Sequence, residues 1–306
     1  MISPLTGKDG SQLLARLNPK EISEKWQKSM GIDIGDEFRD LEAIEYWKCP
    51  VTNFHWYSPE QAVGSDHLYI QLQKFPWYYM TNKWEFVATT KLLDPKSSIL
   101  EVGVGGGHFL ELARNLGHQV CGTELNPAAA ESARMRGFQI HQQDFNKLKP
   151  TTGLLFDAVC SFQVLEHIAK PREFIENMIG LLKPGGKLYI SVPNAIVMRR
   201  IDKHHEDLLN QPPHHLGHWD EYVFRALENL LPLKVKSIHR EPLADYHVDW
   251  MVNGYLRTIL SPLGKRLSQR AINRYSTLPL RWMMQAGLRK CFPGHTLLVE
   301  LELQNR

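Results

Sequence analysis

Alternating glycines beside a carboxylate are the feature of this 306-residue chain that is best suited to chemistry. Glu101, Gly103, Gly105 and Gly107 alternate with other residues, directly at the end of the apolar run 98–102. Glycine lets the backbone turn tightly and approach a ligand with no Cβ in the way. A carboxylate next to such a turn is suited to a ligand that carries an ammonium group. The stretch therefore predicts a small-molecule site.

The elements around this turn must hold it in place. The apolar run predicts a strand, and the recurrence of Phe109, Leu110 and Ala113 at helical spacing predicts a helix to about residue 116. A strand, a glycine turn and a helix in this order begin a nucleotide-binding βαβ unit. A dinucleotide site needs Gly or Ala at the sixth position, where this chain has His108. A nucleotide-dependent oxidoreductase is thereby the less favoured alternative.

The same alternation of apolar strands and helices continues along the chain. Strands are predicted at 98–102, 119–124, 138–142, 156–161, 187–192, 233–239 and 296–303. Helices are predicted between them, one beginning at Pro127 and one after Pro171. This order predicts an α/β fold with a doubly wound, seven-stranded Rossmann-like sheet.

Polar residues at the strand ends extend the predicted site. Ligands of open α/β sheets bind outside the carboxyl ends of the strands. Glu124 ends the second strand, where its carboxylate can accept hydrogen bonds from two ribose hydroxyls; capping the next helix is its alternative role. Asp144, after the third strand, can accept from an adenine amino group, and Phe145 can pack on the ring. The alternative for Asp144 is an acidic loop residue with no role in binding.

A resemblance to a known family rests on three stretches of sequence. Residues 156–168 (FDAVCSFQVLEHI), 170–174 (KPREF) and 181–194 (LLKPGGKLYISVPN) resemble the ubiquinone-biosynthesis-like methyltransferases of type 11 and type 23. These are class I enzymes that use S-adenosylmethionine (SAM), and the alternating glycines resemble their first motif. The likeness covers roughly residues 84–240.

The resemblance implies further features of the fold and the site. It implies that the last strand lies antiparallel between the fifth and sixth strands, and that residues 161–164 line the methionine end of SAM. It also implies that Glu166 and His167 are structural. Together with the strand-end residues, it predicts a SAM site formed by Glu101, Gly103, Gly105, Gly107, Glu124, Leu125, Asp144, Phe145, Phe162 and Gln163.

Five histidines lie within residues 204–218, namely His204, His205, His214, His215 and His218. They invite a metal hypothesis, but no predicted helix carries a His-x-x-x-His pair with a carboxylate as third ligand, and two prolines interrupt the segment. No metal is therefore predicted. The segment follows the fifth strand, where the fold admits the methyl acceptor. A neutral imidazole of His214 or His215 can there accept a proton from an attacking hydroxyl, or merely hydrogen-bond within a loop.

The N-terminal part carries little visible chemistry. Residues 1–45 predict short helices or an irregular arm, residues 46–60 an aromatic loop, and residues 66–93 a helical cap. Cys49 and His55 alone cannot complete a tetrahedral zinc site. Tyr79 and Trp84 are weak candidates for the pocket. The predicted units are an N-terminal extension (1–93), a SAM-binding core (94–240), a basic helical insertion (241–294) and the last core strand (295–306).

The insertion is unusual in charge. Residues 250–299 contain eight Lys or Arg and no Asp or Glu, with apolar residues between them. Such a segment suits an anionic membrane surface or an anionic substrate, or packs as a cap on the sheet. The net charge of the whole chain, +3, is too small to indicate nucleic acid.

Composition completes the prediction. The four cysteines form no C-x-x-C pair, and no apolar run has the length of a membrane span. This predicts a cytoplasmic protein, with peripheral contact to a membrane as the further option. The predicted function is SAM-dependent methyl transfer to a small-molecule, glycan or lipid-linked acceptor, at oxygen. A non-catalytic SAM-fold protein that binds a partner is the other alternative.

Overall fold

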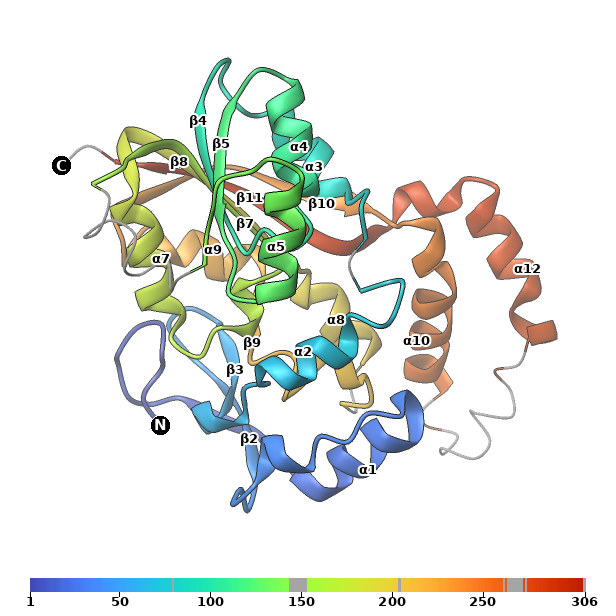
Figure 1. Cartoon of the computed structure of the whole chain (residues 1–306). Helices are drawn as coiled ribbons and strands as arrows, with labels where there is room; N and C mark the ends of the chain where they lie inside the picture. Colours follow the sequence, from blue (N-terminus) through green and yellow to red (C-terminus); the bar gives the residue numbers. More distant parts are fainter. Residues whose placement is uncertain are drawn as a thin grey trace.

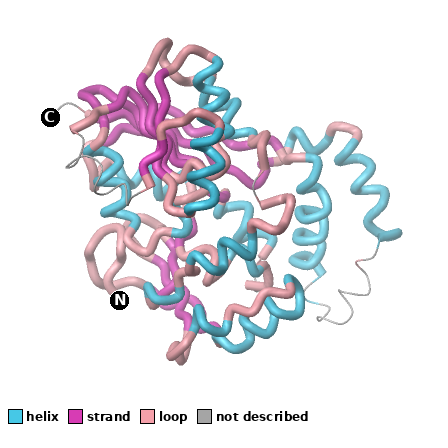
Figure 2. Tube along the Cα trace, viewed as in Figure 1, coloured by secondary structure: helices cyan, strands magenta, loops and turns pink. Residues whose placement is uncertain are grey.

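The computed structural model describes residues 1–78, 80–142, 153–202, 205–260, 262, 272 and 274–304. Its main element is a seven-stranded sheet in the order β10–β11–β8–β7–β4–β5–β6 (Figures 1 and 2). The strands are β4 (Ser98–Val102), β5 (Gln119–Thr123), β6 (Ile140–His141), β7 (Phe156–Phe162), β8 (Leu182–Pro193), β10 (Leu233–Pro242) and β11 (Pro293–Leu303). Strands β4 to β8 are parallel to one another, and β11 is antiparallel to both β8 and β10. The predicted fold and the position of the last strand are confirmed.

Helices cover both faces of this sheet, because successive residues of a strand point to opposite sides. Ile99 of β4 packs in a cluster with Phe86 and Phe109, whereas its neighbour Leu100 packs in the cluster that contains Phe174 and Phe224. The helices around the sheet are α3 (Trp84–Thr90), α4 (His108–Asn115), α5 (Pro127–Met135), α7 (Pro171–Gly180), α8 (Ala195–Ile201) and α9 (Glu221–Leu227). The Rossmann-like, doubly wound arrangement places the glycine turn at the carboxyl end of β4.

A second, antiparallel sheet lies beyond that carboxyl end (Figure 1). Its order is β1–β2–β3–β9, with β1 (Gln12–Leu17), β2 (Ile44–Lys48), β3 (His55–Ser58) and β9 (Gly217–His218). Helix α1 (Pro19–Met30) follows β1. The prediction of short helices or an arm for residues 1–45 holds for α1 and the 3-10 helix Gly35–Phe38 but is wrong where β1 and the start of β2 form. The loop predicted for 46–60 is wrong where β2 and β3 form. These strands pair with one another and with β9, which is about 160 residues away along the chain.

The predicted helix over residues 66–93 is two helices. Helix α2 (Asp66–Leu72) ends before Pro76, and α3 begins only at Trp84. Proline lacks a backbone N–H and restricts the residue before it, which ends the first helix. The segment between them lies over the pocket described below. Tyr79 lies outside the described residues, and Trp84 packs in the core with Phe86 rather than lining the pocket.

The basic insertion forms α10 (Val248–Leu260) and α12 (Arg274–Gln285), which lie side by side at the edge of the molecule (Figure 1). Arg281 pairs with Asp249 at 3.0 Å and Arg289 with Asp245 at 3.5 Å, so acids that directly precede the acid-free stretch 250–299 neutralise part of its charge. Lys265, Arg266 and Arg270 lie outside the described residues. Among the described helices, none has both the length and the apolar character needed to cross a bilayer. The short 3-10 helices are Gly35–Phe38, Glu60–Ala62, Leu165–His167, Leu208–Asn210, Asp245–His247 and Leu288–Cys291.

Candidate functional site

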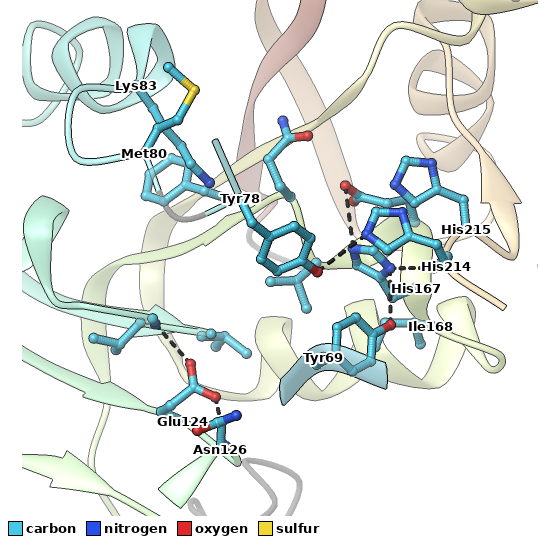
Figure 3. Close-up of a pocket in the computed structure, with 18 of the residues that line it drawn as sticks. Tyr69, Tyr78, Met80, Lys83, Glu124, Asn126, His167, Ile168, His214 and His215 are labelled. Carbon is cyan, nitrogen blue, oxygen red and sulfur yellow. Dashed lines mark hydrogen bonds and ion pairs between the residues drawn. The ribbon is translucent and has the colours of Figure 1, made fainter. Parts of the chain in front are cut away.

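A cavity of about 770 Å³ opens at the carboxyl ends of the parallel strands. One part of it, the glycine side, is lined by Glu101, Gly103, Gly105, Glu124, Leu125, Phe162 and Gln163. The other part, the histidine side, is lined by Tyr69, Tyr78, Glu166, His167, His214, His215, His247 and His295. Figure 3 shows Glu124 and the histidine cluster at opposite ends of this space. The cavity therefore joins two chemically different surfaces.

Glu124 is held rigidly on the glycine side. One of its carboxylate oxygens accepts a hydrogen bond from the backbone N–H of Gly105 and the other from that of Asn126, each at 2.8 Å (Figure 3). Each oxygen keeps a further lone pair for a ligand. The sequence left open that Glu124 caps the following helix instead. Asn126 is that cap, because its side chain accepts a hydrogen bond from the N–H of Ala129. Glu124 is thus oriented for hydroxyl donors in the cavity.

Glu101 is the second carboxylate of the glycine side. It is 1% exposed, and its Oε2 has no hydrogen-bond partner among the described residues. Burial raises its pKa well above the usual value, and Glu124 adds to this, whereas Lys83 opposes it. A buried acceptor without a partner is costly unless a ligand supplies a donor. A cationic group fits this position.

The glycines of the turn have different roles. Gly103 and Gly105 line the cavity, with φ of 82° and 53°. A Cβ at Gly103 would lie 2.6 Å from Cγ2 of Val164, so a larger residue cannot be accommodated there without displacement. Gly107 does not line the cavity; a Cβ there would meet Phe138 and Ala133. Of the three predicted glycines, two are therefore at the cavity.

The remaining predicted residues of the glycine side come from two strand ends. Phe162 packs on Phe109, with ring centroids 4.7 Å apart, and Gln163 donates to Ser191 Oγ at 3.3 Å. Leu125 is 66% exposed at the rim. The three predicted residues Leu125, Phe162 and Gln163 line the cavity. Asp144 and Phe145, predicted for an adenine ring, lie outside the described residues.

Three imidazoles meet on the histidine side. The ring centroids of His214 and His215 are 4.4 Å apart, and His167 lies 4.7 and 5.0 Å from them. Tyr78 hydrogen-bonds His214 Nε2 at 3.2 Å, and Tyr69 lies 3.2 Å from His167 Nδ1 (Figure 3). The structure brings His214 and His215 together with a residue, His167, that the sequence had suggested was structural.

Burial sets the charge of these rings. It lowers the pKa of His167 to about 4 and that of His214 to about 3, and the pKa of His215 falls well below its usual value. The neighbouring imidazoles lower the last two further. Burial also raises the pKa of Glu166, which adjoins the cluster, to about 8. The three rings are therefore neutral at physiological pH, and they are weak bases.

The other histidines of the predicted segment are placed elsewhere. His218 bonds Tyr46 and the carbonyl of Asn210, inside the small sheet. His205 bonds Tyr57, and His204 lies outside the described residues. Arg199 pairs with Asp220 at 2.5 Å rather than facing the cavity. These residues fix the segment that carries His214 and His215.

Sequence reasoning missed several residues of the cavity. Tyr78 and Lys83 come from the loop between α2 and α3, His247 from the 3-10 helix Asp245–His247, and His295 from the start of β11. No local pattern marks these four. Glu166 did carry a signal, because it stands in the stretch that resembles the methyltransferase family.

Comparison with known proteins gives the family. A family model described as a methyltransferase domain matches residues 77–286. The chain belongs to this methyltransferase family. Its sheet order is that of the class I, SAM-dependent members, so SAM is the cofactor to be tested against the site.

Individual relatives are more distant. A ubiquinone biosynthesis O-methyltransferase of Xanthomonas oryzae is 36% identical over 102 residues, covering 31% of this chain and 43% of that protein. One of Xanthomonas campestris is 34% identical over 116 residues, covering 36% and 48%. The chain thus spans less than half of these relatives' lengths. The N-methyltransferase NodS of Bradyrhizobium japonicum, solved with S-adenosylhomocysteine, aligns at 18% identity and a TM-score of 0.45, covering 75% of this chain and 92% of that one.

The residues of the glycine side fit SAM. The unpartnered oxygen of Glu101 matches an ammonium group, and the fixed carboxylate of Glu124 matches a pair of ribose hydroxyls. Gly105 lines the cavity with backbone alone, which lets a ligand approach closely. These groups are therefore chemically suited to the cofactor of the family.

Proposed function

We propose that the chain transfers the methyl group of SAM to a hydroxyl oxygen of an acceptor bound at the histidine side. One observation carries this proposal: a single cavity joins the carboxylates Glu101 and Glu124 to three neutral imidazoles. Positioning two reactants in one enclosed space supplies much of the rate of a bimolecular transfer. The acceptor class is a small molecule, a glycan or a lipid-linked compound.

On the glycine side, the chain's own groups would hold the cofactor. Glu101 would accept from the ammonium group and Glu124 from the ribose hydroxyls, while Leu125, Phe162 and Gln163 enclose the rest. Asp144 and Phe145 are proposed for the adenine. SAM supplies an electrophilic methyl group on a sulfonium, and the sulfur leaves as a neutral thioether.

On the histidine side, the residues proposed to act on the acceptor are His214 and His215. The hydroxyl must lose its proton as the new O–C bond forms, and the C–S bond breaks with its electron pair going to sulfur. An imidazole can receive that proton only when it is neutral, and both rings are neutral because they are buried. From the imidazole, the proton passes to solvent.

Two observations support a hydroxylated acceptor with an apolar or lipid-linked part. The Xanthomonas relatives are named O-methyltransferases of ubiquinone biosynthesis. In addition, α12 exposes Leu278, Trp282 and Met283 in a segment with an excess of basic residues, which suits peripheral contact with an anionic membrane. We propose this contact as the route by which a lipid-linked acceptor is reached.

The test uses methyl-labelled SAM with the full chain and a panel of phenolic, glycan and prenylated hydroxyl acceptors. Replacing His214 and His215 together by Gln should lower turnover about a hundredfold while SAM affinity is unchanged. His67→Gln, on the exposed face of α2, is the matched control and should have no effect. Transfer to amines alone, or full turnover in the double variant, would contradict the proposal.

A further inference from the structure

The three imidazoles of the histidine side have an arrangement that a proton acceptor alone does not require. His167 comes from the 3-10 helix Leu165–His167, and His214 and His215 come from the segment that precedes β9. One ring nitrogen from each lies within 4.8 Å of the others. All three residues line the cavity. Three nitrogen donors therefore share one small space that a ligand can enter.

The hydrogen bonds of the cluster determine which ring nitrogens carry a proton. His214 Nδ1 lies 2.9 Å from the carbonyl of Leu209, and His167 Nδ1 lies 2.5 Å from the carbonyl of His214. A carbonyl oxygen only accepts, so each Nδ1 carries the proton and each Nε2 is an acceptor. The Nε2 of His214 accepts from the Tyr78 hydroxyl at 3.2 Å, a hydrogen bond that a bound ion would replace. An imidazole that donates its other N–H to a backbone carbonyl is typical of a metal ligand.

The third ring is consistent with the same role. Within the described part of the chain, the His215 ring has no hydrogen-bond partner and is stacked against His214 at an interplanar angle of 27°. A structural cluster would pair each ring nitrogen with a donor or an acceptor. The ring nitrogens of His215 therefore remain available to a ligand that enters the cavity.

We propose that His167, His214 and His215 form a binding site for one divalent transition-metal ion, with Zn²⁺ as the best match. Neutral imidazoles suit zinc and its neighbours in the series rather than magnesium or calcium. Three protein ligands and one open position are typical of a catalytic zinc site. Tetrahedral zinc needs nitrogen pairs roughly 3.3 Å apart, so the rings would tighten by about an ångström or more.

A carboxylate lies next to the proposed ion. Glu166 Oε1 is 3.9 Å from His167 Nε2, and Glu166 Oε2 has no partner among the described residues. An ionised carboxylate at this distance would compensate part of the charge of a cation. The sequence pattern did not predict this site because its third ligand lies 47 residues before His214.

For its catalytic consequence, this inference rests on the proposed function. With an ion bound, the open position would hold the acceptor's hydroxyl oxygen and lower its pKa, so that the proton leaves to solvent rather than to an imidazole. The His214 and His215 double variant loses turnover in either case. A measurement of metal binding separates the two roles.

The experiment titrates the chelator-stripped full chain with Zn²⁺ alone by calorimetry, and with Co²⁺ alone by visible absorption. We expect one ion per chain and the absorption of tetrahedral cobalt. In His214→Asn, the side-chain amide can still donate to the Leu209 carbonyl, but the Nε2 ligand is lost. This variant and His215→Asn should each bind zinc at least about a hundredfold more weakly.

His239→Asn is the matched control, because His239 lies on β10 outside the cavity and bonds Ser237. Thermal unfolding and SAM binding show whether each variant is folded. Zinc affinity that is equal in wild type and His215→Asn, or no zinc binding by the folded wild type, would overturn the site and leave the proposed function intact. One tightly bound zinc per chain, lost in both variants, with no methyl transfer to any hydroxyl, would support the site and contradict the proposed function.

Discussion

The glycine side and the histidine side of the cavity are built in opposite ways. The glycine side comes from the ends of adjacent parallel strands, each followed by its own turn, within residues 101–164. The histidine side gathers residues from 69 to 295, brought together by the small sheet, the loop after α2 and the insertion. The first surface depends on local turns, and the second depends on long-range packing.

This difference determines what a mutation can do. On the glycine side, backbone N–H groups and carboxylates act directly on a ligand, so substitutions should change affinity with little change in stability. On the histidine side, residues outside the cavity, such as Asp220 with Arg199, join the two helices α8 and α9 that flank the segment with His214 and His215. Substitutions of such residues outside the cavity should lower the stability of the fold more than they change the affinity for a ligand. The predictions below test this separation.

The largest effect is expected at Gly105. A valine there would place a side chain in the cavity at a φ of 53°, and SAM affinity should fall at least about a thousandfold. Calorimetry on the full chain measures this. Gly185→Val is the control for backbone strain, because Gly185 also has a positive φ, 73°, but no neighbour within 4 Å and no place in the cavity. Near-native SAM affinity in a folded Gly105→Val protein would contradict the binding of SAM at the glycine side.

The next effect concerns stability rather than binding. Asp220 is fully buried, pairs with Arg199, and accepts from the N–H groups of Tyr222 and Val223 at the start of α9. Asp220→Ala would leave a partly buried guanidinium unpaired and should lower the free energy of unfolding by about 3 kcal/mol.

Denaturant unfolding checks this loss. Glu221→Ala is the neighbouring control, because its ion pair with Arg240 lies at the surface and should contribute about 1 kcal/mol or less. Equal losses in the two variants would show that Asp220 does not hold the histidine side in place.

Glu124 should give a smaller, purely ligand-directed effect. Glu124→Ala removes both acceptors proposed for the ribose hydroxyls and should weaken SAM binding by about tenfold or more. Glu131→Ala, on the exposed face of α5, should leave the affinity unchanged. An unaltered dissociation constant in Glu124→Ala would mean that another group holds the ribose.

The smallest effect is expected outside the cavity, on the exposed apolar face of α12. Trp282 is 69% exposed and Leu278 is 56% exposed. Replacing both by Ser should lower sedimentation with anionic vesicles a few-fold at low salt, and high salt should weaken the wild type, because each basic residue near such a surface contributes up to about 1 kcal/mol.

Tyr222→Ser, at an equally exposed site on α9, is the control for this change. Equal sedimentation with neutral and anionic vesicles, or with neither, would leave the insertion as a cap on the fold.

The contrast between the two sides also explains what the sequence could predict. Glu101, the glycines and Glu124 stand at strand ends that apolar periodicity marks, so both their elements and their shared cavity were predictable. The strands β1 to β3 could not be predicted in the same way. Their pairing with one another and with β9 depends on contacts between distant parts of the chain rather than on a local pattern. His167 stood in the stretch that resembles the family, but it was assigned a structural role, because its proximity to His214 follows only from the fold.

A co-crystal structure with S-adenosylhomocysteine tests the central claim most directly, namely that one cavity binds the cofactor on one side and leaves the other for the acceptor. The account predicts the ammonium group against Glu101, the ribose hydroxyls within hydrogen-bonding distance of Glu124, and the rings of His214 and His215 left open to the remaining space. A cofactor bound against the histidines, or away from both carboxylates, would contradict it.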